Sequence, residues 1–227
     1  MNESGIGIDT RSLSDRVYDY LSDRIIEGAI QYGQNLNIKE IAETLKVSTM
    51  PVREAVKRME MEGVVRITPR SNCCVRIPTK KSILDAFEMR QLIEIHSLSK
   101  VYRSVKRADL QDLTGIIERM DSIVAVASNP DSLRQYIKLD RLFHDEICRL
   151  SDNEYLDKFC REINLHLNMT YTYGIGVPPD VPRTFADHKS ILERLSQNSA
   201  EAVAILTRHL KRSGENILNG EVFQSLG

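Results

Sequence analysis

The stretch LNIKEIAETLKVSTMPVREAVKRMEMEGVV, residues 36–65, decides how the first part of this chain folds. Its apolar residues recur every three or four positions, which is the spacing of an amphipathic helix. They form two sets, Ile38, Ile41, Ala42 and Leu45 followed by Val52, Ala55, Val56 and Met59. The short segment KVS separates the sets, and Ser48 can cap the second helix while Pro51 fits its first turn. The pattern predicts two helices joined by a tight turn.

A hairpin and a basic helix face accompany these helices. The β-branched runs VVRIT and CCVRI, residues 64–68 and 73–77, flank the turn-like PRSN, which favours a hairpin. At about 100° per residue, one face of the second helix points away from the core. That face carries Met50, Arg53, Lys57 and Arg58. The order of elements predicts a winged helix-turn-helix whose second helix enters the major groove of DNA.

The hairpin would add contacts beside the groove, through Arg70 and Asn72 to the flanking backbone or minor groove. A basic helix face next to a hairpin is also a common solvated surface, and nearby acids dilute the positive charge. These acids are Glu54, Glu60 and Glu62. The net charge of the chain is only -1, so charge alone leaves DNA binding and a plain solvated surface both open.

Residues 28–65, GAIQYGQNLNIKEIAETLKVSTMPVREAVKRMEMEGVV, resemble the DNA-binding signature of the GntR family of bacterial transcription regulators. The specific part is PVREAV with EGVV behind it. The resemblance implies that Ser48, Thr49 and Arg53 contact DNA. Thr49 stands where the family usually has Arg, which removes a potential bidentate contact to guanine worth about 1 to 3 kcal/mol. Asn72 replaces the usual wing-tip Gly, and Asn tolerates the left-handed backbone better than most residues.

After Pro78 the chain reads as helix throughout. We expect helices at residues 82–105, 109–127, 132–150, 153–173, 184–197 and 199–218, with GIGVPPDVP as a loop. The expected fold is mainly α, with an α+β winged helix-turn-helix domain over residues 1–78 and an all-α six-helix bundle over residues 79–227.

Composition places the chain among ordinary globular proteins, because 41% of its 227 residues are hydrophobic. It has no apolar run of membrane-spanning length and no targeting pattern at its start, so we expect a cytoplasmic protein without a membrane partner. Its four cysteines are then most simply reduced thiols. They are Cys73, Cys74, Cys148 and Cys160.

The segment YIKLDRLFHDEI, residues 136–147, places Asp140 and His144 one turn apart on the edge of an apolar helix face. Leu139, Leu142, Phe143, Ile147 and Leu150 make up that face. His188 and His209 project from the apolar faces of the last two helices. A carboxylate buried alone is too costly, so it must be paired or bound to a metal. Asp140 and the three imidazoles can form one metal site, but an inward His is often only a hydrogen-bonded core residue. Both interpretations stay open from the residues alone.

The order DxxxH, then HKSILERL, then TRHL resembles the FCD effector domain of the FadR-like branch of the GntR family. The resemblance implies that Asp140, His144, His188 and His209 bind a divalent metal ion and that a small organic acid approaches it. Imidazole and carboxylate suit zinc best, although nickel, manganese and iron also accept them.

Three further residues bear on the effector. His166 projects near the apolar arc formed by Phe159, Ile163 and Tyr173, and we expect a core or effector contact rather than a metal ligand. His96 faces the surface. Arg90 and Glu94 lie four apart, which is typical of an internal salt bridge, yet a buried guanidinium is also suited to grip a carboxylate effector.

The combined expectation is a transcription regulator, a repressor that binds double-stranded operator DNA as a homodimer and responds to a small organic acid. Two-fold symmetry doubles the base pairs read and brings affinity into a useful range. One rival interpretation is a metal-dependent hydrolase or lyase, which the absence of an HExxH pair from the sequence disfavours. The other is a regulator whose His cluster is structural and free of metal.

Overall fold

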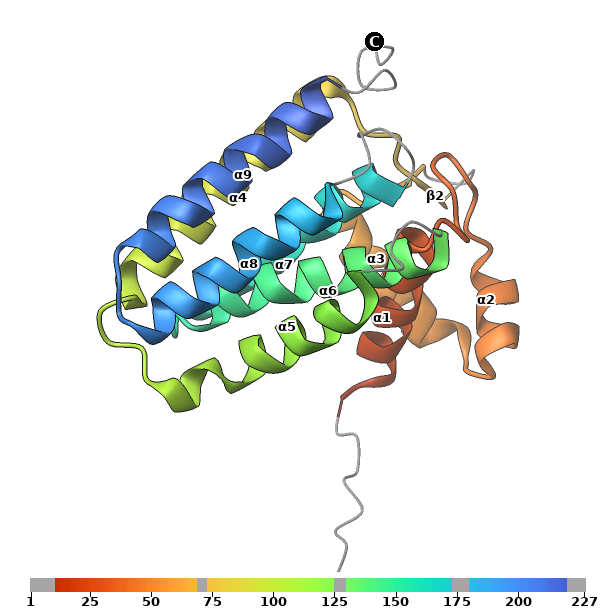
Figure 1. Ribbon diagram of the computed structural model, residues 1–227. Coiled ribbons are helices and arrows are strands. Elements are labelled where there is room, and N and C mark those ends of the chain that lie inside the picture. Colours follow the sequence, from red (N-terminus) through yellow and green to blue (C-terminus); the bar gives the residue numbers. More distant parts are fainter. Residues whose placement is uncertain (1–10, 69–72, 125–129, 173–179, 220–227) are drawn as a thin grey trace, which may run out of the picture. The chain divides into compact units, whose positions relative to one another are not determined.

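The computed structural model describes residues 11–68, 73–124, 130–172 and 180–219 (Figure 1). The chain divides into two compact units, Met1–Ile77 and Pro78–Gly227. Within the described ranges, none of the helices combines the length and the apolar character needed to cross a membrane.

The first unit is a winged helix-turn-helix. It contains α1 (Leu13–Ile26), α2 (Ile38–Leu45), α3 (Thr49–Met61), β1 (Val65–Ile67) and β2 (Cys73–Val75). α3 packs against both α1 and α2, and its apolar side chains Val52 and Met59 are fully buried. The strands pair antiparallel, with Val65 opposite Val75. The fold class expected from the sequence is therefore confirmed for this unit.

α1 was not among the helices expected from the sequence. Ser12 caps it by accepting a hydrogen bond from the backbone N–H of Asp15, at 3.1 Å. Val17, Leu21 and Ile25 recur every four residues and are buried, so a periodic signal was present. The helix supplies the surface on which α3 rests.

The turn between α2 and α3 differs in one detail from expectation. Asn37 caps α2 by accepting hydrogen bonds from the backbone N–H groups of Lys39 and Glu40. Lys46 ends α2 in the left-handed region, at φ 54°, which turns the chain sharply into α3. Ser48 occupies the N-cap position of α3, but its side chain makes no capping hydrogen bond.

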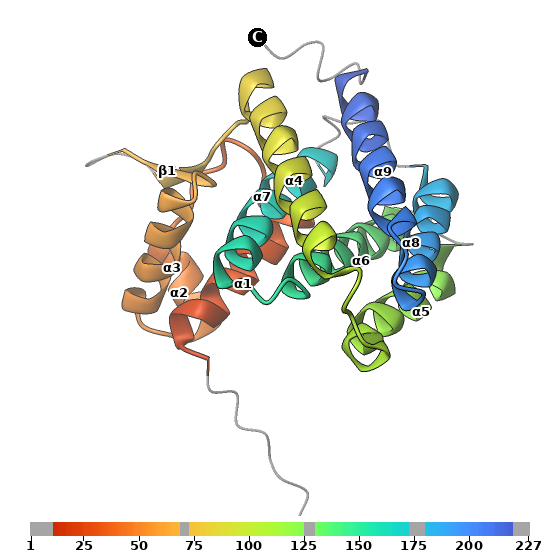
Figure 2. The ribbon, with the colours of Figure 1, turned by 90° about the vertical axis from the view of Figure 1, so that its left-hand side faces the viewer.

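The second unit is the expected all-helical bundle. It contains α4 (Lys80–Val101), the short 3₁₀ helix η1 (Arg107–Leu110), α5 (Gln111–Val124), α6 (Pro130–Arg149), α7 (Glu154–Thr172), α8 (Val181–Ser196) and α9 (Glu201–Leu218). The six α-helices close into a ring in the order α4, α7, α6, α5, α8, α9 and back to α4 (Figure 2). Side chains inside the ring, including Met120, Phe143, Leu195 and Leu206, are fully buried. Residues that point inward from α6, α8 and α9 therefore share one interior.

Some boundaries differ from the sequence expectation. α8 begins at Val181 rather than at Thr184, because Asp180 caps it and Pro182 sits in the first turn, where no N–H is needed. On α6 and α7, the buried part of each helix is also narrower than the apolar face expected from the sequence. Leu142 and Phe159, which were expected on buried arcs, are 41% and 47% exposed.

The expectation of reduced cysteines is wrong for one pair. Cys148 on α6 and Cys160 on α7 form a disulfide, with their Cα atoms 6.4 Å apart. Both are buried beside Ile93. The pairing depends on two helices lying side by side, which the spacing of cysteines along the chain does not reveal. Cys73 and Cys74 are free.

Candidate metal centre

The structure brings the four expected metal ligands together inside the helical ring. Asp140 and His144 come from α6, His188 from α8 and His209 from α9. One ligand atom from each side chain lies within 4.8 Å of all the others. The three imidazoles are almost completely buried, while the side chain of Asp140 keeps 18% of its surface exposed.

The Nε2 atoms of the three imidazoles converge on one point. The Nε2 of His209 lies 3.3 Å from that of His144 and 3.4 Å from that of His188. Two nitrogen ligands on a tetrahedral ion, each about 2.1 Å from it, are about 3.4 Å apart. The spacing therefore matches the edges of a tetrahedral site.

Asp140 completes the fourth corner of the group. Its Oδ1 lies 3.6 Å from the Nε2 of His188, and its Oδ2 lies 3.9 Å from the Nε2 of His144. Three nitrogens and one carboxylate oxygen form a donor set that suits zinc and other first-row divalent ions. The residues present thus fit a metal ion in both geometry and chemistry.

Burial keeps two of the imidazoles, those of His144 and His188, in the neutral form that binds metals. It lowers the pKa of His144 well below the ordinary value of 6.5, and the positive charge of Arg90 acts in the same direction. Burial also lowers the pKa of His188 well below that value, and electrostatic repulsion from His209 acts in the same direction. Both rings are therefore neutral at pH 7, with a lone pair free for a cation.

Behind His144 lies a pair that the sequence showed only in part. The Nε of Arg90 donates a hydrogen bond to Oε1 of Glu94 at 2.8 Å, as the i, i+4 spacing predicted. The other carboxylate oxygen of Glu94 lies 2.6 Å from Nδ1 of His144. Burial raises the pKa of Glu94, and the Arg90 guanidinium opposes that shift. No sequence pattern linked Glu94 to His144, because 50 residues separate them.

Behind His209 lies a second pair, which the sequence did not reveal. Oδ2 of Asp187 lies 3.4 Å from Nδ1 of His209 and accepts a hydrogen bond from Arg212 at 2.5 Å. Although partial burial acts to raise it, the contact with His209 and the hydrogen bond from Arg212 hold the pKa of Asp187 below its ordinary value.

The two other histidines stay outside this group. His96 is exposed on α4, as expected. His166 is half-buried on α7 and is not one of the four clustered ligands. Its role as an effector contact stays a prediction.

The residues expected to contact DNA lie largely on the open face of α3. Ser48, Thr49, Arg53 and Lys57 are exposed. Lys57 also forms an ion pair with Glu60 at 2.8 Å. Arg70 and Asn72, expected at the wing tip, lie outside the described residues.

Arg58 occupies a different environment from the rest of the expected DNA-contacting set. Its guanidinium carbon lies 4.0 Å from the centre of the Tyr18 ring on α1. It also pairs with Asp15 at 3.3 Å and with Glu62 at 3.0 Å. The contacts with Tyr18 and Asp15 hold Arg58 against α1, although its side chain stays 48% exposed. Its contact with DNA stays a prediction.

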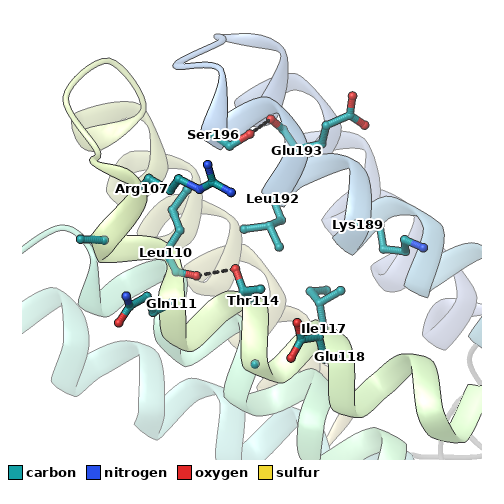
Figure 3. A pocket seen from close by; sticks show the side chains of 12 residues that line it. Arg107, Leu110, Gln111, Thr114, Ile117, Glu118, Lys189, Leu192, Glu193 and Ser196 are labelled. Atoms are coloured by element: carbon teal, nitrogen blue, oxygen red, sulfur yellow. Dashed lines mark hydrogen bonds between the residues drawn. The ribbon is translucent and has the colours of Figure 1, made fainter.

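A surface groove lies between η1, α5 and α8 and is separate from the metal centre (Figure 3). Arg107, Thr114, Glu118 and Lys189 line it, and none of the four clustered ligands does. The hydroxyl of Thr114 donates to the backbone carbonyl of Leu110 in η1, so it offers no donor to a bound molecule. The groove adds no ligand to the candidate centre.

Comparison with known families assigns both units. The FCD domain matches residues 85–212, and the bacterial regulatory proteins of the gntR family match residues 13–75. The chain belongs to the GntR family. As a GntR protein with an FCD domain, it is a DNA-binding transcription regulator and not an enzyme, which decides against the hydrolase or lyase interpretation.

Individual relatives agree with this assignment. The chain is 29% identical to the gluconate operon transcriptional repressor of Bacillus subtilis, over 62% of this chain and 56% of the repressor. A putative GntR regulator from Rhodococcus sp. RHA1 superposes with a TM-score of 0.75 at 22% identity, covering 92% of this chain and 98% of the other. McbR/YncC of Escherichia coli gives a TM-score of 0.78 at 20% identity, covering 91% and 97%. The two solved structures support the fold.

Proposed function

We propose that this GntR regulator is a repressor that carries a divalent metal ion and responds to a small organic acid. The observation that carries the metal is the convergence of three buried Nε2 atoms at 3.3 and 3.4 Å, with the carboxylate of Asp140 beside them. Imidazole nitrogens packed so closely gain little from one another, whereas a shared cation can accept a lone pair from each of them. We favour zinc because the spacing is tetrahedral.

Metal content tests this proposal directly. Protein purified without chelator or metal-affinity resin should contain about one ion per chain by elemental analysis, with zinc dominant. His188→Ala should lower zinc affinity on the order of 100-fold or more, since outer-shell changes alone cost 10- to 100-fold. His96→Ala is the matched control, because it removes an exposed imidazole outside the cluster. Metal-free wild-type protein that stays metal-free after zinc is added would refute the proposal.

The effector would be a small carboxylate held between the metal and Arg90. Arg90 is buried with only 5% of its side chain exposed, and its partner Glu94 contacts a metal-ligand candidate directly. A guanidinium offers several donors in a planar fork, which suits a carboxylate better than an ammonium group does. Binding would shift repression only as far as the acid prefers one arrangement of the protein over another.

A thermal-shift screen of small organic acids on zinc-loaded protein tests the effector site. An acid that binds the folded state raises the melting temperature. Arg90→Lys keeps the charge but loses the fork, so it should abolish that rise. An unchanged rise in Arg90→Lys would remove Arg90 from the effector site.

A homodimer would bind the operator as a palindrome, with one α3 helix in each half-site. The helical unit offers a surface suited to a second copy. A groove of about 540 Å³ lies between α4 and α9, and Leu84 and Leu92 beside it are 44% and 60% exposed. Large exposed apolar side chains gathered on one helix are typical of an interface.

Light scattering across a concentration series tests the dimer. Leu92→Glu should yield a folded monomer with weaker operator binding, because a charge would be buried in the interface. Leu142→Glu, on exposed α6 surface, is the matched control and should stay dimeric. A Leu92→Glu variant that remains dimeric would place the interface elsewhere.

A further inference from the structure

Two of the three imidazoles at the centre are each backed by a carboxylate that an arginine holds in turn. His144 is followed by Glu94 and Arg90, and His209 by Asp187 and Arg212. The arginines and carboxylates come from α4, α8 and α9, so each chain of contacts crosses from one helix to another.

His188 lacks such a partner. Its Nδ1 is buried and has no hydrogen-bond partner among the described residues. Its ring instead stacks on Phe143, with centroids 4.1 Å apart and planes at 21°. Packing therefore orients His188, whereas the short contact with Glu94 orients His144. Nδ1 of His209 also makes no hydrogen bond among the described residues, but the carboxylate of Asp187 lies 3.4 Å from it.

A carboxylate behind an imidazole determines which ring nitrogen carries the proton. A neutral imidazole has one N–H, and a carboxylate accepts that N–H strongly. With Glu94 only 2.6 Å from Nδ1 of His144, the proton belongs on Nδ1 and the lone pair on Nε2. Nε2 is the atom that lies 3.3 Å from its counterpart on His209. The tautomer is thus matched to the shared site before any ion arrives.

We propose that Glu94 and Asp187, each held by its arginine, are positioning residues that present Nε2 of His144 and His209 to the metal. The inference rests on the proposed metal binding. Glu94 is the better supported positioning residue of the two. It and His144 are fully buried, and its Oε2 lies 2.6 Å from Nδ1 of His144. Asp187 keeps 25% of its side chain exposed, and its 3.4 Å separation from His209 is long for a hydrogen bond.

Zinc affinity and cobalt spectra test the role of each carboxylate. Glu94→Gln keeps the size of the side chain and should weaken zinc binding 10- to 100-fold in competition with a chromophoric chelator. It should also alter the visible spectrum of the Co²⁺-loaded protein, because one ligand ring is no longer fixed. Asp187→Asn should act in the same direction, with a smaller loss.

Glu146→Gln is the matched control. Glu146 is a buried carboxylate of α6 that pairs with Arg149, and it contacts none of the four ligands in the described structure. Its substitution should leave zinc affinity and the Co²⁺ spectrum unchanged. If the loss of any buried ion pair weakened zinc binding, Glu146→Gln would weaken it too. If Glu94 acts by positioning His144, Glu146→Gln should bind zinc as the wild-type protein does.

Nitrogen-15 NMR of the imidazole rings tests the inference in the wild-type protein, whether or not Glu94→Gln folds. In metal-free protein at neutral pH, the proton should lie on Nδ1 of His144 and of His209. A proton on Nε2 of His144, or full zinc affinity in Glu94→Gln, would overturn the positioning role. Failure of the wild-type protein itself to bind zinc would instead refute the proposed function, so the two failures can be told apart.

Discussion

Arg53 and Arg58 lie five residues apart on α3, and their different surroundings predict different roles. Arg53 is exposed, and no ion pair holds it within the described residues. Arg58 stacks on Tyr18 and pairs with Asp15 and Glu62. A helical wheel places both residues on one basic face. In the structure, however, Arg58 contacts α1 through Tyr18 and Asp15.

Substitution of each arginine by alanine should expose this difference. Arg53→Ala should weaken specific operator binding by about 1 to 3 kcal/mol without loss of stability. Arg58→Ala should lower the free energy of unfolding of the winged unit by about 1 kcal/mol, since the stacked, partly exposed guanidinium contributes on that order. Operator titrations at fixed salt and urea unfolding measure the two effects. Equal loss of DNA affinity in both folded variants would return Arg58 to the DNA interface.

The metal-ligand candidates could be predicted from the sequence, but the positioning roles of Glu94 and Asp187 could not. Asp140 and His144 were visible because a polar pair one turn apart on an apolar face is unusual. Glu94 and Asp187 were not, since a carboxylate near an arginine on a helix is common and nothing local points it toward a distant imidazole.

The N-cap residues of α2 and α3 differ in whether their side chains stabilise the helix. Asn37 and Ser48 both occupy N-cap positions, but only Asn37 makes the capping hydrogen bonds. The hydroxyl of Ser48 is therefore available to a phosphate at the N-terminus of α3, where backbone N–H groups favour an anion.

Alanine at the two caps should give opposite results. Asn37→Ala should cost about 1 kcal/mol of stability, which is the usual loss for a capping side chain. Ser48→Ala should leave stability nearly unchanged and weaken operator binding. Chemical denaturation and DNA titration of the two variants provide the comparison. A stability loss in Ser48→Ala as large as in Asn37→Ala would show that Ser48 caps α3 after all.

Gly115 offers a gain in stability within α5. It lies inside the helix, and an added Cβ would meet no atom within 4 Å. Gly115→Ala should therefore raise the free energy of unfolding by roughly 1 kcal/mol through helix propensity. Gly214→Ala in α9 is the contrast, because its Cβ would come 3.4 Å from Phe87, so its gain should be smaller. Thermal unfolding of both variants decides, and a loss of stability in Gly115→Ala would contradict the open space seen beside it.

Across the bundle, a bound ion would join helices that are far apart in the chain. The ligands come from α6, α8 and α9, so the ion would link three members of the ring while leaving the winged unit untouched. Folding of the helical unit and occupancy of the site are then coupled, because the unfolded chain does not hold the ligands together.

Removing the ion should destabilise the two units unequally. At free zinc about 1,000-fold above its dissociation constant, binding adds about 4 kcal/mol to stability, which chelation removes. Hydrogen exchange read by mass spectrometry should show faster exchange in α6, α8 and α9 after chelation, with α1 to α3 unchanged. Equal acceleration in both units, or none, would contradict a site confined to the helical unit.

The winged helix-turn-helix and the helical bundle could be predicted from the sequence because their signals are local. The period of apolar residues over positions 36–65, the turn at KVS and the hairpin runs each depend on neighbours a few positions apart. The same locality explains why Leu142 and Phe159 are exposed against expectation, since a helical wheel does not show what packs against each part of a face. It does not explain α1, whose apolar period is itself a local signal.

Contacts between distant segments required the packed bundle. The ring of helices brings position 94 to position 144, position 187 to position 209, and Cys148 to Cys160. Sequence encodes which side of each helix is apolar, and so which residues point inward. Which inward residues meet depends on helix order, tilt and rotation, and these arise from the fit of whole faces against one another.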